Sequence, residues 1–397
     1  MKKILTAFAA LLLSVSLGFA AHLAFALDEA VLANPETTSV NTEGSGAGTD
    51  ANANTNTDAE TADNSVLSFT LEEAIKYAET GNPSLRLADS RLAILDRQNE
   101  QAWAVQRVVI VQDIDSRKAK ELNHKRAHWT LDNAKHDREV QLKDLRVQIT
   151  NSYQNILALQ QQVDNYTAQL ANLDTVISQI NLQIELGLRI PTEVLAYTAQ
   201  KSALEAAQKA VLSSADSAMI VLKQDLGIDV NREIVLTSEL MPYTKFDDSD
   251  LEEMIAEAIR NHYDYQRYER DIEITDIEYR INFQFSDPAT DQVELSIEDK
   301  KGTLANLPVN LEVGFRTAYN NIKSLENTIA ANELTLEADQ INIGVMQKNI
   351  DVGRAGDLEM ISLQNTLLSN RLTLQQNVIA HTTAVENLKN SLTVSKN

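Results

Sequence analysis

The sequence predicts an all-α protein built from two tandem copies of a long antiparallel coiled-coil hairpin. One pattern recurs after 166 residues, so that Tyr153 and Gly187 of the first copy match Tyr319 and Gly353 of the second. Each copy also has an apolar residue at every seventh position, which is typical of helices packed in a coiled coil. A duplication of this kind indicates two stacked copies of one helical unit.

The heptad rows run in matching register through the two copies. They comprise Ile156, Val163, Leu170, Ile177 and Ile184 in the first copy, and Ile322, Ile329, Leu336, Ile343 and Ile350 in the second. A strict seven-residue period of this length predicts long, supercoiled helices that pack by knobs into holes.

We expect the N-terminal segments to lie outside the folded body. Residues 1–26 open with Lys2 and Lys3, continue with an apolar run and offer a small-residue cleavage site, so we interpret them as a secretory signal peptide. An uncleaved membrane anchor is the alternative. Residues 27–65 carry eight acidic residues and neither Lys nor Arg, which predicts a disordered acidic linker.

The first repeat is predicted to span residues 66–245 and the second residues 246–397. Thr70 is a candidate N-cap with Glu73 three residues later, which is the capping-box arrangement. Asp250 carries the same signal 180 residues after Thr70, whereas later markers are 166 apart. The second copy has therefore lost 14 residues (180 minus 166) between its first helix and its long helix.

The repeats diverge in that interval. The first copy reads as nearly continuous helix over residues 88–150, with a strand-like patch at residues 108–111. In the second, residues 281–285 and 293–297 alternate around a turn cluster, which predicts at most one short β-hairpin. We then expect Pro308 near the first turn of the following helix.

Each hairpin is expected to reverse at a glycine. Gly187 is followed by Pro191, and Gly353 by Asp357, a candidate N-cap. The first return helix carries a stripe of alanines, which predicts close approach of the two helices of the hairpin. The stripe comprises Ala196, Ala199, Ala203, Ala206 and Ala210.

Several short motifs occur in order along residues 66–395. They are Leu71-Glu72-Glu73-Ala74 with Gly81-Asn82-Pro83, Tyr153-Gln154-Asn155-Ile156, Tyr319-Asn320-Asn321-Ile322, and the tips Gly187…Glu193-Val194 and Gly353…Glu359-Met360. Their order and duplication resemble the outer-membrane efflux family, the TolC-like exit ducts. The family inserts two transmembrane strands per repeat, but neither copy has a pair of alternating runs of ~9–11 residues with aromatic girdles. We therefore expect a variant with little or no transmembrane β-barrel.

The resemblance implies a homotrimer whose helices form a twelve-helix α-barrel around a lumen. It also implies two partners, an inner-membrane pump and a periplasmic adaptor that meets the hairpin tips. Carried over to this sequence, the adaptor-facing residues are Gly187, Leu188, Arg189, Thr192, Gly353, Arg354 and Asp357. Asn332 and Asp339 replace Tyr166 and Leu173 of the first copy, where they either line a lumen or gate or fix the helix register.

The sequence offers little for catalysis, and we predict neither an enzyme nor a cofactor. Glu121, His124, His128 and Asp132 have a spacing that could hold a divalent metal, but a solvated polar face is the preferred interpretation and no metal is predicted. His381 lies in a heptad row, which favours a packed core residue. There is no phosphate-binding loop, nucleophile elbow or zinc motif.

The net charge and the cysteine content limit the kinds of partner and of binding site that the chain can have. The net charge of −22 argues against nucleic acid, since phosphate contacts need clustered Lys and Arg. The absence of cysteine excludes disulfides, thiolate metal sites and a lipid-bearing cysteine. Residues 97–146 hold eleven basic and eight acidic residues, so they either touch anionic envelope polymers or form a mixed-charge solvated helix pair, which we favour.

These features predict an exported, trimeric helical conduit component of an efflux or type I secretion machine. It would lie in the periplasm and outer membrane of a host with two membranes, or otherwise in the extracytoplasmic envelope. One alternative is a non-transporting structural or adaptor protein that keeps the same helical body. Another is a lone coiled-coil scaffold that binds a different envelope protein. A duct requires closure by several chains, so the oligomeric state separates these functions.

Overall fold

The computed structural model describes residues 66–393, which belong to one compact unit. The predicted signal peptide and acidic linker lie outside the described residues. The elements, in chain order, are β1 (Leu67–Phe69), α1 (Leu71–Gly81), α2 (Pro83–Val108), α3 (Ile114–Glu121), α4 (Asn123–Glu185), α5 (Thr192–Leu226), β2 (Ile234–Leu236), α6 (Leu251–Arg260), α7 (Tyr263–Gln284), α8 (Thr290–Asp351) and α9 (Asp357–Thr393). The predicted all-α class with two tandem helical hairpins is confirmed.

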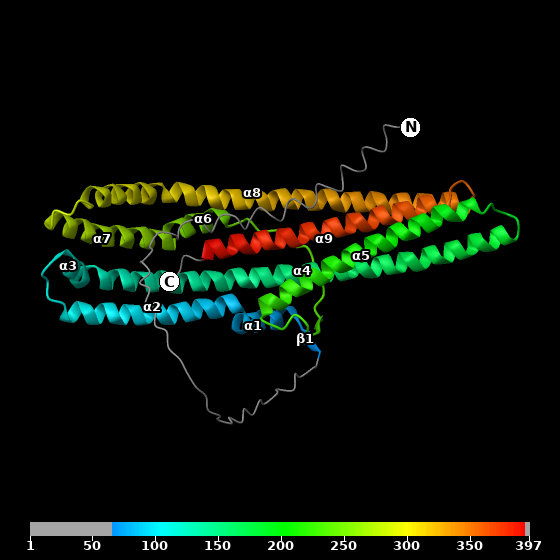
Figure 1. Cartoon of the computed structure of the whole chain (residues 1–397). Coiled ribbons are helices and arrows are strands. Elements are labelled where there is room, and N and C mark those ends of the chain that lie inside the picture. The colour runs from blue at the N-terminus through cyan, green and yellow to red at the C-terminus, as the bar shows by residue number, and fades with distance from the viewer. Residues whose placement is uncertain (1–65, 394–397) are drawn as a thin grey trace, which may run out of the picture. The chain divides into compact units, whose positions relative to one another are not determined.

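Two helices run the length of the described body. α4 has 63 residues and α8 has 62, so each spans about 95 Å at ~1.5 Å per residue. Figure 1 shows α2 and α5 placed along successive halves of α4, and α7 and α9 along successive halves of α8. α9 also packs along α4 and joins the two hairpins. Within the described residues, no helix is both long and apolar enough to cross a membrane.

We name the two ends of this body by their connections. The tip end holds the α4–α5 connection, residues 186–191, and the α8–α9 connection, residues 352–356. The turn end holds the α2–α3 connection, residues 109–113, and the α7–α8 connection, residues 285–289. α3 has no counterpart in the second copy, which accounts for most of the predicted 14-residue loss.

The heptad rows face the neighbouring helices, as predicted. Ile156, Ile322 and Ile329 are fully buried, and the remaining members of the first row are half-buried. The second half of α4 contributes Leu173 and Ile180 to a cluster with residues of α5 and α9. Because a long helix has no globular core behind it, these stripes supply most of its apolar burial.

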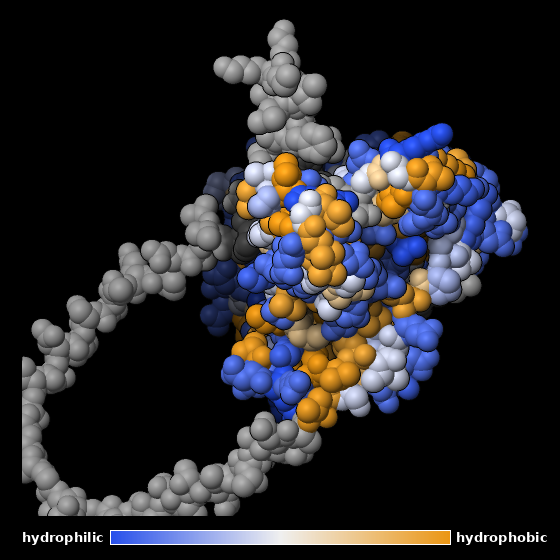
Figure 2. Space-filling view, turned by 90° about the vertical axis from the view of Figure 1, so that its right-hand side faces the viewer, coloured by the Kyte–Doolittle hydropathy of each residue, from blue (hydrophilic) through white to orange (hydrophobic). Residues whose placement is uncertain are grey.

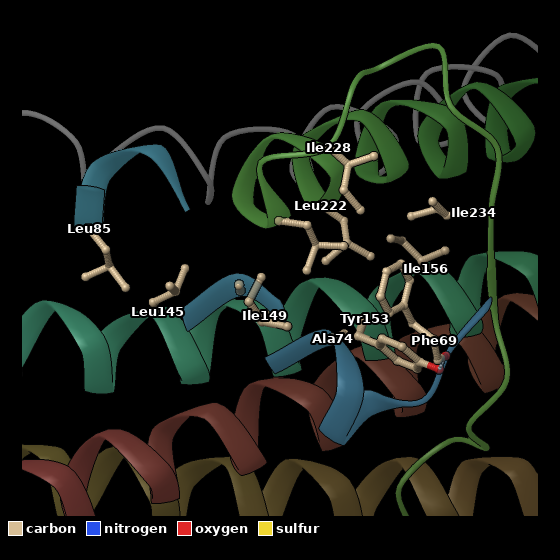
Figure 3. Packing of buried hydrophobic residues seen from close by; sticks show 12 residues of the cluster. Phe69, Ala74, Leu85, Leu145, Ile149, Tyr153, Ile156, Leu222, Ile228 and Ile234 are labelled. Atoms are coloured by element: carbon tan, nitrogen blue, oxygen red, sulfur yellow. Dashed lines mark hydrogen bonds between the residues drawn. The ribbon is translucent and has the colours of Figure 1, made fainter. Parts of the chain in front are cut away.

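The middle of α4 anchors the start of the chain and the segment after α5. β1 and β2 pair in parallel, with Leu67 opposite Ile234. The buried Tyr153 hydroxyl donates a hydrogen bond to the carbonyl of Phe69 (2.7 Å) and accepts bonds from the amides of Thr237 (3.0 Å) and Ser238 (2.9 Å). Figure 3 shows this tyrosine in the apolar cluster that joins α1, α4 and α5. One hydroxyl thus holds both strands against the long helix.

The predicted capping box at the start of α1 is confirmed. The Glu73 amide donates to the Thr70 hydroxyl (3.3 Å), and the Thr70 amide donates to the Glu73 carboxylate (2.8 Å). At the other end of α1, the Asn82 amide group donates to the Asp225 carbonyl at the end of α5 (2.7 Å). Gly227 has φ +71°, and a Cβ there would collide with the carbonyl of Gly81. The Gly-Asn-Pro motif therefore ends α1, caps α2 and fixes α5.

The predicted β-hairpin is wrong. Residues 281–284 end α7 and residues 293–297 lie in α8. Strand alternation would place Ile281 and Phe283 on one face, yet Ile281 is 2% exposed and Phe283 is 68% exposed. The stronger signal was the helical spacing of Ile274, Ile277 and Ile281, which are buried in one cluster at the turn end.

Three further expectations need correction. Pro308 lies inside α8 rather than in its first turn, so α8 lacks one backbone hydrogen bond there. Residues 109–111 connect α2 to α3 and form no strand. The alanine stripe of α5 is exposed, and Tyr197 and Leu204 pack in the hairpin instead. Apolar bulk decided which face of α5 is buried, since larger side chains remove more surface from water.

Removal of the Tyr153 hydroxyl tests this anchor. In Tyr153→Phe, the Ser238 amide loses its acceptor, whereas the Phe69 carbonyl and the Thr237 amide keep the hydrogen bond between them (3.0 Å), so we expect the free energy of unfolding to fall by roughly 1–3 kcal/mol. Urea denaturation followed by circular dichroism measures this. The matched control is Tyr319→Phe, whose hydroxyl donates to the exposed Asp248 carboxylate (2.7 Å), and we expect a much smaller loss of stability. Equal losses in the two variants would contradict the account.

Candidate functional site at the hairpin tips

The first tip is a tight glycine-centred reversal. The Gly187 amide donates to the Ile184 carbonyl (2.9 Å), and the Leu188 amide donates to the Gln183 carbonyl (2.8 Å). This pair of bonds is the Schellman motif, which needs a left-handed residue after the helix. Gly187 supplies it with φ +73°.

The second tip repeats this geometry in the second copy. The Gly353 amide donates to the Ile350 carbonyl (2.9 Å), and the Arg354 amide donates to the Asn349 carbonyl (2.7 Å). Gly353 has φ +71°. Both predicted reversals are therefore confirmed, and the two tips present the same backbone shape at one end of the body.

The side chains at the two tips differ. Arg189 forms an ion pair with Glu193 inside its own tip (3.2 Å), just after Thr192 begins α5. Arg354 is exposed, and no described side chain forms an ion pair with it. The N-cap predicted at Asp357 is off by one residue, because α9 begins at Asp357 and Gly356 therefore precedes the first helical residue. The cation of the first tip is thus neutralised, whereas Arg354 has no ion-pair partner among the described side chains.

The tip end is also rich in exposed apolar side chains. Figure 2 looks onto this end and shows hydrophobic surface among the polar groups. The exposed apolar residues nearest to the two turns are Leu182, Leu186, Leu188, Ile190, Leu195 and Val352. Most belong to the first tip, so the two tips combine an apolar surface with a neighbouring cation.

The two polar positions of α8 face its partner helix. Asp339 accepts a hydrogen bond from the Asn370 amide group of α9 (2.7 Å). The equivalent residues of the first copy, 166 positions earlier, are Leu173 and Leu204, which lie in one buried cluster. The Asn332 amide nitrogen is buried without a hydrogen-bond partner among the described residues. A polar pair therefore replaces an apolar pair inside the second hairpin.

A partly buried polar cluster attaches the inter-repeat segment (residues 237–250, between β2 and α6) to α8 and α9, and sequence analysis did not identify it. Lys323 contacts Asp248 and Glu326 (2.9 Å each), and Glu326 accepts a hydrogen bond from the Phe246 amide (3.1 Å). His381 is 2% exposed and its ring lies 3.6 Å from the Glu326 carboxylate. The i, i+3 spacing of Lys323 and Glu326 beside a heptad histidine was the available signal. The cluster fixes the inter-repeat segment to α8 and α9.

Charge and burial shift the titration of this cluster. Hydrogen bonds from Lys323 and then Tyr319 hold the pKa of Asp248 at about 2. Burial lowers the pKa of His381 and outweighs the nearby Glu326 carboxylate, which raises it. Burial of Glu326 favours its protonated form, but Lys323 and the Phe246 amide outweigh this and lower its pKa. The cluster is therefore most stable with His381 neutral and both carboxylates charged.

The candidate metal ligands do not converge. His124 is buried and its ring packs at a tilt against Trp103 (4.5 Å between ring centroids), whereas His128 is exposed and contacts Asp132 (3.4 Å). Glu121 forms an ion pair with Arg117 (3.2 Å). Across residues 66–393, no three His, Asp or Glu side chains are grouped in a way that could hold a metal ion. The packed position predicted for His381 is confirmed.

The Asp339–Asn370 pair makes a testable contribution to the second hairpin. Asp339→Ala leaves the Asn370 amide group without its acceptor, and we expect the free energy of unfolding to fall by about 1–2 kcal/mol. Restoring the apolar pair of the first copy with Asp339→Leu and Asn370→Leu should recover or exceed the stability of the native chain. A double-mutant cycle in urea measures the coupling. No coupling between the two positions would contradict a paired role.

The pKa of His381 predicts a loss of stability in mild acid. Its folded pKa lies below its unfolded value of ~6.5, so its contribution is complete above that pH and is lost as pH falls through the folded pKa. One such histidine changes the free energy of unfolding by at most about 1.4 kcal/mol per pH unit. His381→Gln should flatten the profile between about pH 7 and 5, and His128→Gln, which alters an exposed histidine outside the cluster, is the matched control variant.

Buried His124 and half-buried His136 also have lowered pKa values, so some slope should remain in His381→Gln. An unchanged profile in this variant would show that the cluster does not depend on neutral His381.

Comparison with known proteins is informative at the level of the fold. The sequence matches no protein-family model and no curated protein. The structure is similar to the outer membrane protein VceC of Vibrio cholerae, with 13% identity, a TM-score of 0.60, and coverage of 81% of this chain and 94% of that one. It is similar to the CmeC outer membrane channel of Campylobacter jejuni, with 8% identity, a TM-score of 0.60, and coverage of 82% and 86%.

The MtrE outer membrane channel of Neisseria gonorrhoeae gives the same result, with 9% identity, a TM-score of 0.59, and coverage of 81% and 88%. These channels share the two-hairpin architecture over most of their length. The chain has the fold of the TolC-like outer-membrane efflux channels.

Proposed function

We propose that several copies of this chain, most simply three, close into a helical ring that encloses a water-filled path through part of the cell envelope. In this proposal the chain is a conduit component of an efflux or type I secretion machine. The similarity to proteins described as outer membrane channels supports it. The observation that carries it is the open row of helices within each chain.

The row has two open edges in its tip half. The order of helices there is α5, α4, α9, α8, and α4 and α9 each pack along a long helix on both sides. α5 and α8 are the edge helices of the row. A row of helices with two free edges can close only by joining further copies through a heterologous contact, which generates a ring.

Both edges carry the small or apolar residues that such a contact needs. On α8, Leu334 and Ile341 are 68% and 59% exposed and lie roughly 180° around the helix from the buried heptad row. On α5, the exposed alanine stripe lies roughly 140° around the helix from Tyr197 and Leu204. A stripe of small residues facing a stripe of larger ones lets two helices approach closely. These angles suit neighbours in a large ring.

The turn half offers a second pair of apolar edge stripes. α2 exposes Leu87 (59%) and Ile94 (58%) one heptad apart, and α8 exposes Val309 (62%) and Val313 (60%) one turn apart. Monomeric soluble proteins rarely leave such rows uncovered. The proposed lateral contact would therefore continue along the whole body.

The remaining parts of the machine follow from the two ends of the chain. We propose that the tip residues Gly187, Leu188, Arg189, Thr192, Gly353, Arg354 and Asp357 meet a periplasmic adaptor, which links the conduit to an inner-membrane pump. Residues 1–26 would direct export, residues 27–65 would act as a tether, and residues 66–245 and 246–397 would be the two repeats. The mechanism assigns no catalytic residue and no cofactor.

Anionic envelope polymers are a secondary proposed partner of residues 97–146. Eight of the eleven basic side chains in this stretch form ion pairs with carboxylates of the same chain. Lys120 donates instead to the Gln106 carbonyl (2.7 Å). This extensive pairing favours the mixed-charge helix pair over a polymer site.

The alternative function is a structural or adaptor protein that keeps the helical body without transport. The family pattern places transmembrane strands between the first helix and the long helix of each repeat. In this chain, helices α2, α3 and α7 occupy those intervals. A protein of this kind would need the tips and the inter-repeat cluster but no closed ring. Closure is therefore the property that decides between the two functions.

Charge placed on the α8 edge tests closure. We expect residues 27–397 to have about three times the mass of one chain by light scattering. Leu334→Glu with Ile341→Glu should reduce the particle to a single chain, because a buried, unpaired carboxylate opposes the contact. The control, Thr335→Glu with Asn342→Glu, adds the same charge roughly 90° away on the helix and should keep the oligomer.

Far-ultraviolet circular dichroism verifies that both double variants remain helical. A single-chain mass for the unaltered protein would contradict the proposal. So would identical behaviour of the edge and control variants.

A further inference from the structure

An open groove lies where the last helix of the described body ends. It has a volume of about 770 Å³ and lies between the first half of α4, the start of α7 and the last turns of α9. Figure 1 shows α9, in red, ending beside the middle of α4 and close to the start of α7. We call this space the junction groove. The proposed conduit does not explain it.

The equivalent junction of the first copy is held by direct contact of two glycines. A Cβ at Gly227, after the end of α5, would lie 2.2 Å from the carbonyl oxygen of Gly81 at the end of α1. The corresponding residues of the second copy are Thr393, 166 positions after Gly227, and Asn261, 180 positions after Gly81. Both carry a Cβ, so the close contact of the first copy cannot form. The second junction therefore needs another group to fill it.

The ends of the two return helices also differ. Gly227 adopts φ +71° and turns the chain so that Ile228 is buried in the apolar cluster of Figure 3. Thr393 is still part of α9, and its hydroxyl donates to the carbonyl of Lys389 one turn earlier (2.9 Å). A β-branched residue rarely adopts a positive φ. We therefore expect residues 394–397 to follow the direction of α9 and not the path of Ile228.

The residues of α9 that line the groove recur at helical spacing. Thr383, Asn387 and Asn390 all line it, and they are four and three positions apart. The next positions in this series are held by Val394 and Asn397. Because residues three and four apart lie on one face of a helix, a continued α9 would turn Val394 toward the groove.

The register of α9 on α4 can be followed from the tips to the groove. The two helices run antiparallel. Leu173 and Ile361 share a buried cluster near the tips, and Thr150 and Thr383 line one small depression nearer the middle of the body. These two pairs are 23 positions apart on α4 (173 minus 150) and 22 positions apart on α9 (383 minus 361). The register is therefore constant along the contact.

The same register brings the next residues of the chain into the groove. Val140 lies ten positions beyond Thr150, and Val394 lies eleven positions beyond Thr383. Val140 is half-buried and lines the groove. Four more helical residues add about 6 Å, which is also the distance along α4 from Val140 to His136 at the start of α7. Residues 394–397 thus have the length that the groove requires.

The side chains of the segment suit those of the groove. Residues 394–397 read Val-Ser-Lys-Asn, with one apolar, one basic and two neutral polar side chains. The groove offers Val140 for the apolar side chain. It also contains Asp137 and Asp144, and neither forms an ion pair with a described side chain. Lys396 would supply the missing positive charge.

We propose that residues 394–397 continue α9 into the junction groove, where Val394 packs on Val140 and the segment joins α4 to the start of α7. The contact ties the last helix of the second repeat to the long helix of the first. It fills the junction that the glycine contact fills in the first copy. All of these contacts lie within one chain, so the proposal does not depend on ring closure.

A disulfide tests the position of the segment, because the chain has no cysteine of its own. In residues 27–397, Val140→Cys with Val394→Cys should form an intramolecular disulfide under mild oxidation, which peptide mass mapping detects. The matched control is Val140→Cys with Ser395→Cys, which moves the second thiol about 100° around the helix. We expect the control pair to oxidise on the order of tenfold more slowly.

Removal of the segment tests its contribution to the groove. A chain that ends at Thr393 should exchange the backbone amides of residues 263–272 several-fold faster, because the first half of α7 loses a packing partner. Hydrogen–deuterium exchange followed by mass spectrometry measures this. The second tip, residues 352–356, lies far from the groove and should exchange as it does in the unaltered protein.

Three results would overturn the proposal. The first is oxidation of the Val394 pair no faster than that of the control pair, which would show that the segment is not held in the groove. The second is disulfides between separate chains, which would assign the groove to the segment of a second copy. The third is unchanged exchange after truncation. None of these concerns the number of chains in the particle, so failure here leaves the proposed conduit untouched.

Discussion

The structure depends on two-sided burial of very long helices. A helix of about 60 residues has no interior of its own, and most of its stability in water comes from the apolar stripes that it covers against neighbours. α4 satisfies this requirement along both halves, since it packs along α2, α5 and α9. α5 and α8 satisfy it on one side and expose alanine and leucine or isoleucine on the other.

The same requirement explains why the middle of the body is the most polar and most specific region. Each long helix changes partners there, so the ends of the shorter helices must be fixed. In the first copy the buried Tyr153 hydroxyl, and the contact of Gly81 with Gly227, fix these ends. In the second, Lys323 and Glu326 fix the inter-repeat segment with charged groups. The duplicated tyrosines therefore differ, since the buried Tyr153 hydroxyl binds three backbone groups and the Tyr319 hydroxyl donates to the exposed Asp248 carboxylate.

Sequence patterns predicted the features that depend on local chemistry. The heptad rows, the capping box at Thr70 and the reversals at Gly187 and Gly353 follow from periodicity, hydrogen-bonding capacity and backbone freedom, and each was confirmed. The resemblance carried by the duplicated motifs predicted the arrangement of the hairpins. These signals are contained in short stretches of chain.

The errors arose where distant residues decide the outcome. Residues 281–297 alternate like strands, but the cluster of Ile274, Ile277 and Ile281 against Leu122 and Trp129 favours helix. The alanine stripe of α5 would suit a close helix contact inside the hairpin or outside it. The face that carries the larger Tyr197 side chain is the one buried in the hairpin. The spacing of Lys323 and Glu326 was a local signal for the cluster around His381, but it did not identify the other members, because Asp248 lies 133 positions from the histidine (381 minus 248).

The central claim is that the exposed edges of α5 and α8 meet between copies and close a ring. Negative-stain electron microscopy of residues 27–397, with averaging of end-on views, tests it most directly. The account predicts ring-shaped particles of threefold symmetry with a stain-filled centre. Solitary rods, or rings with no stain-filled centre, would contradict it.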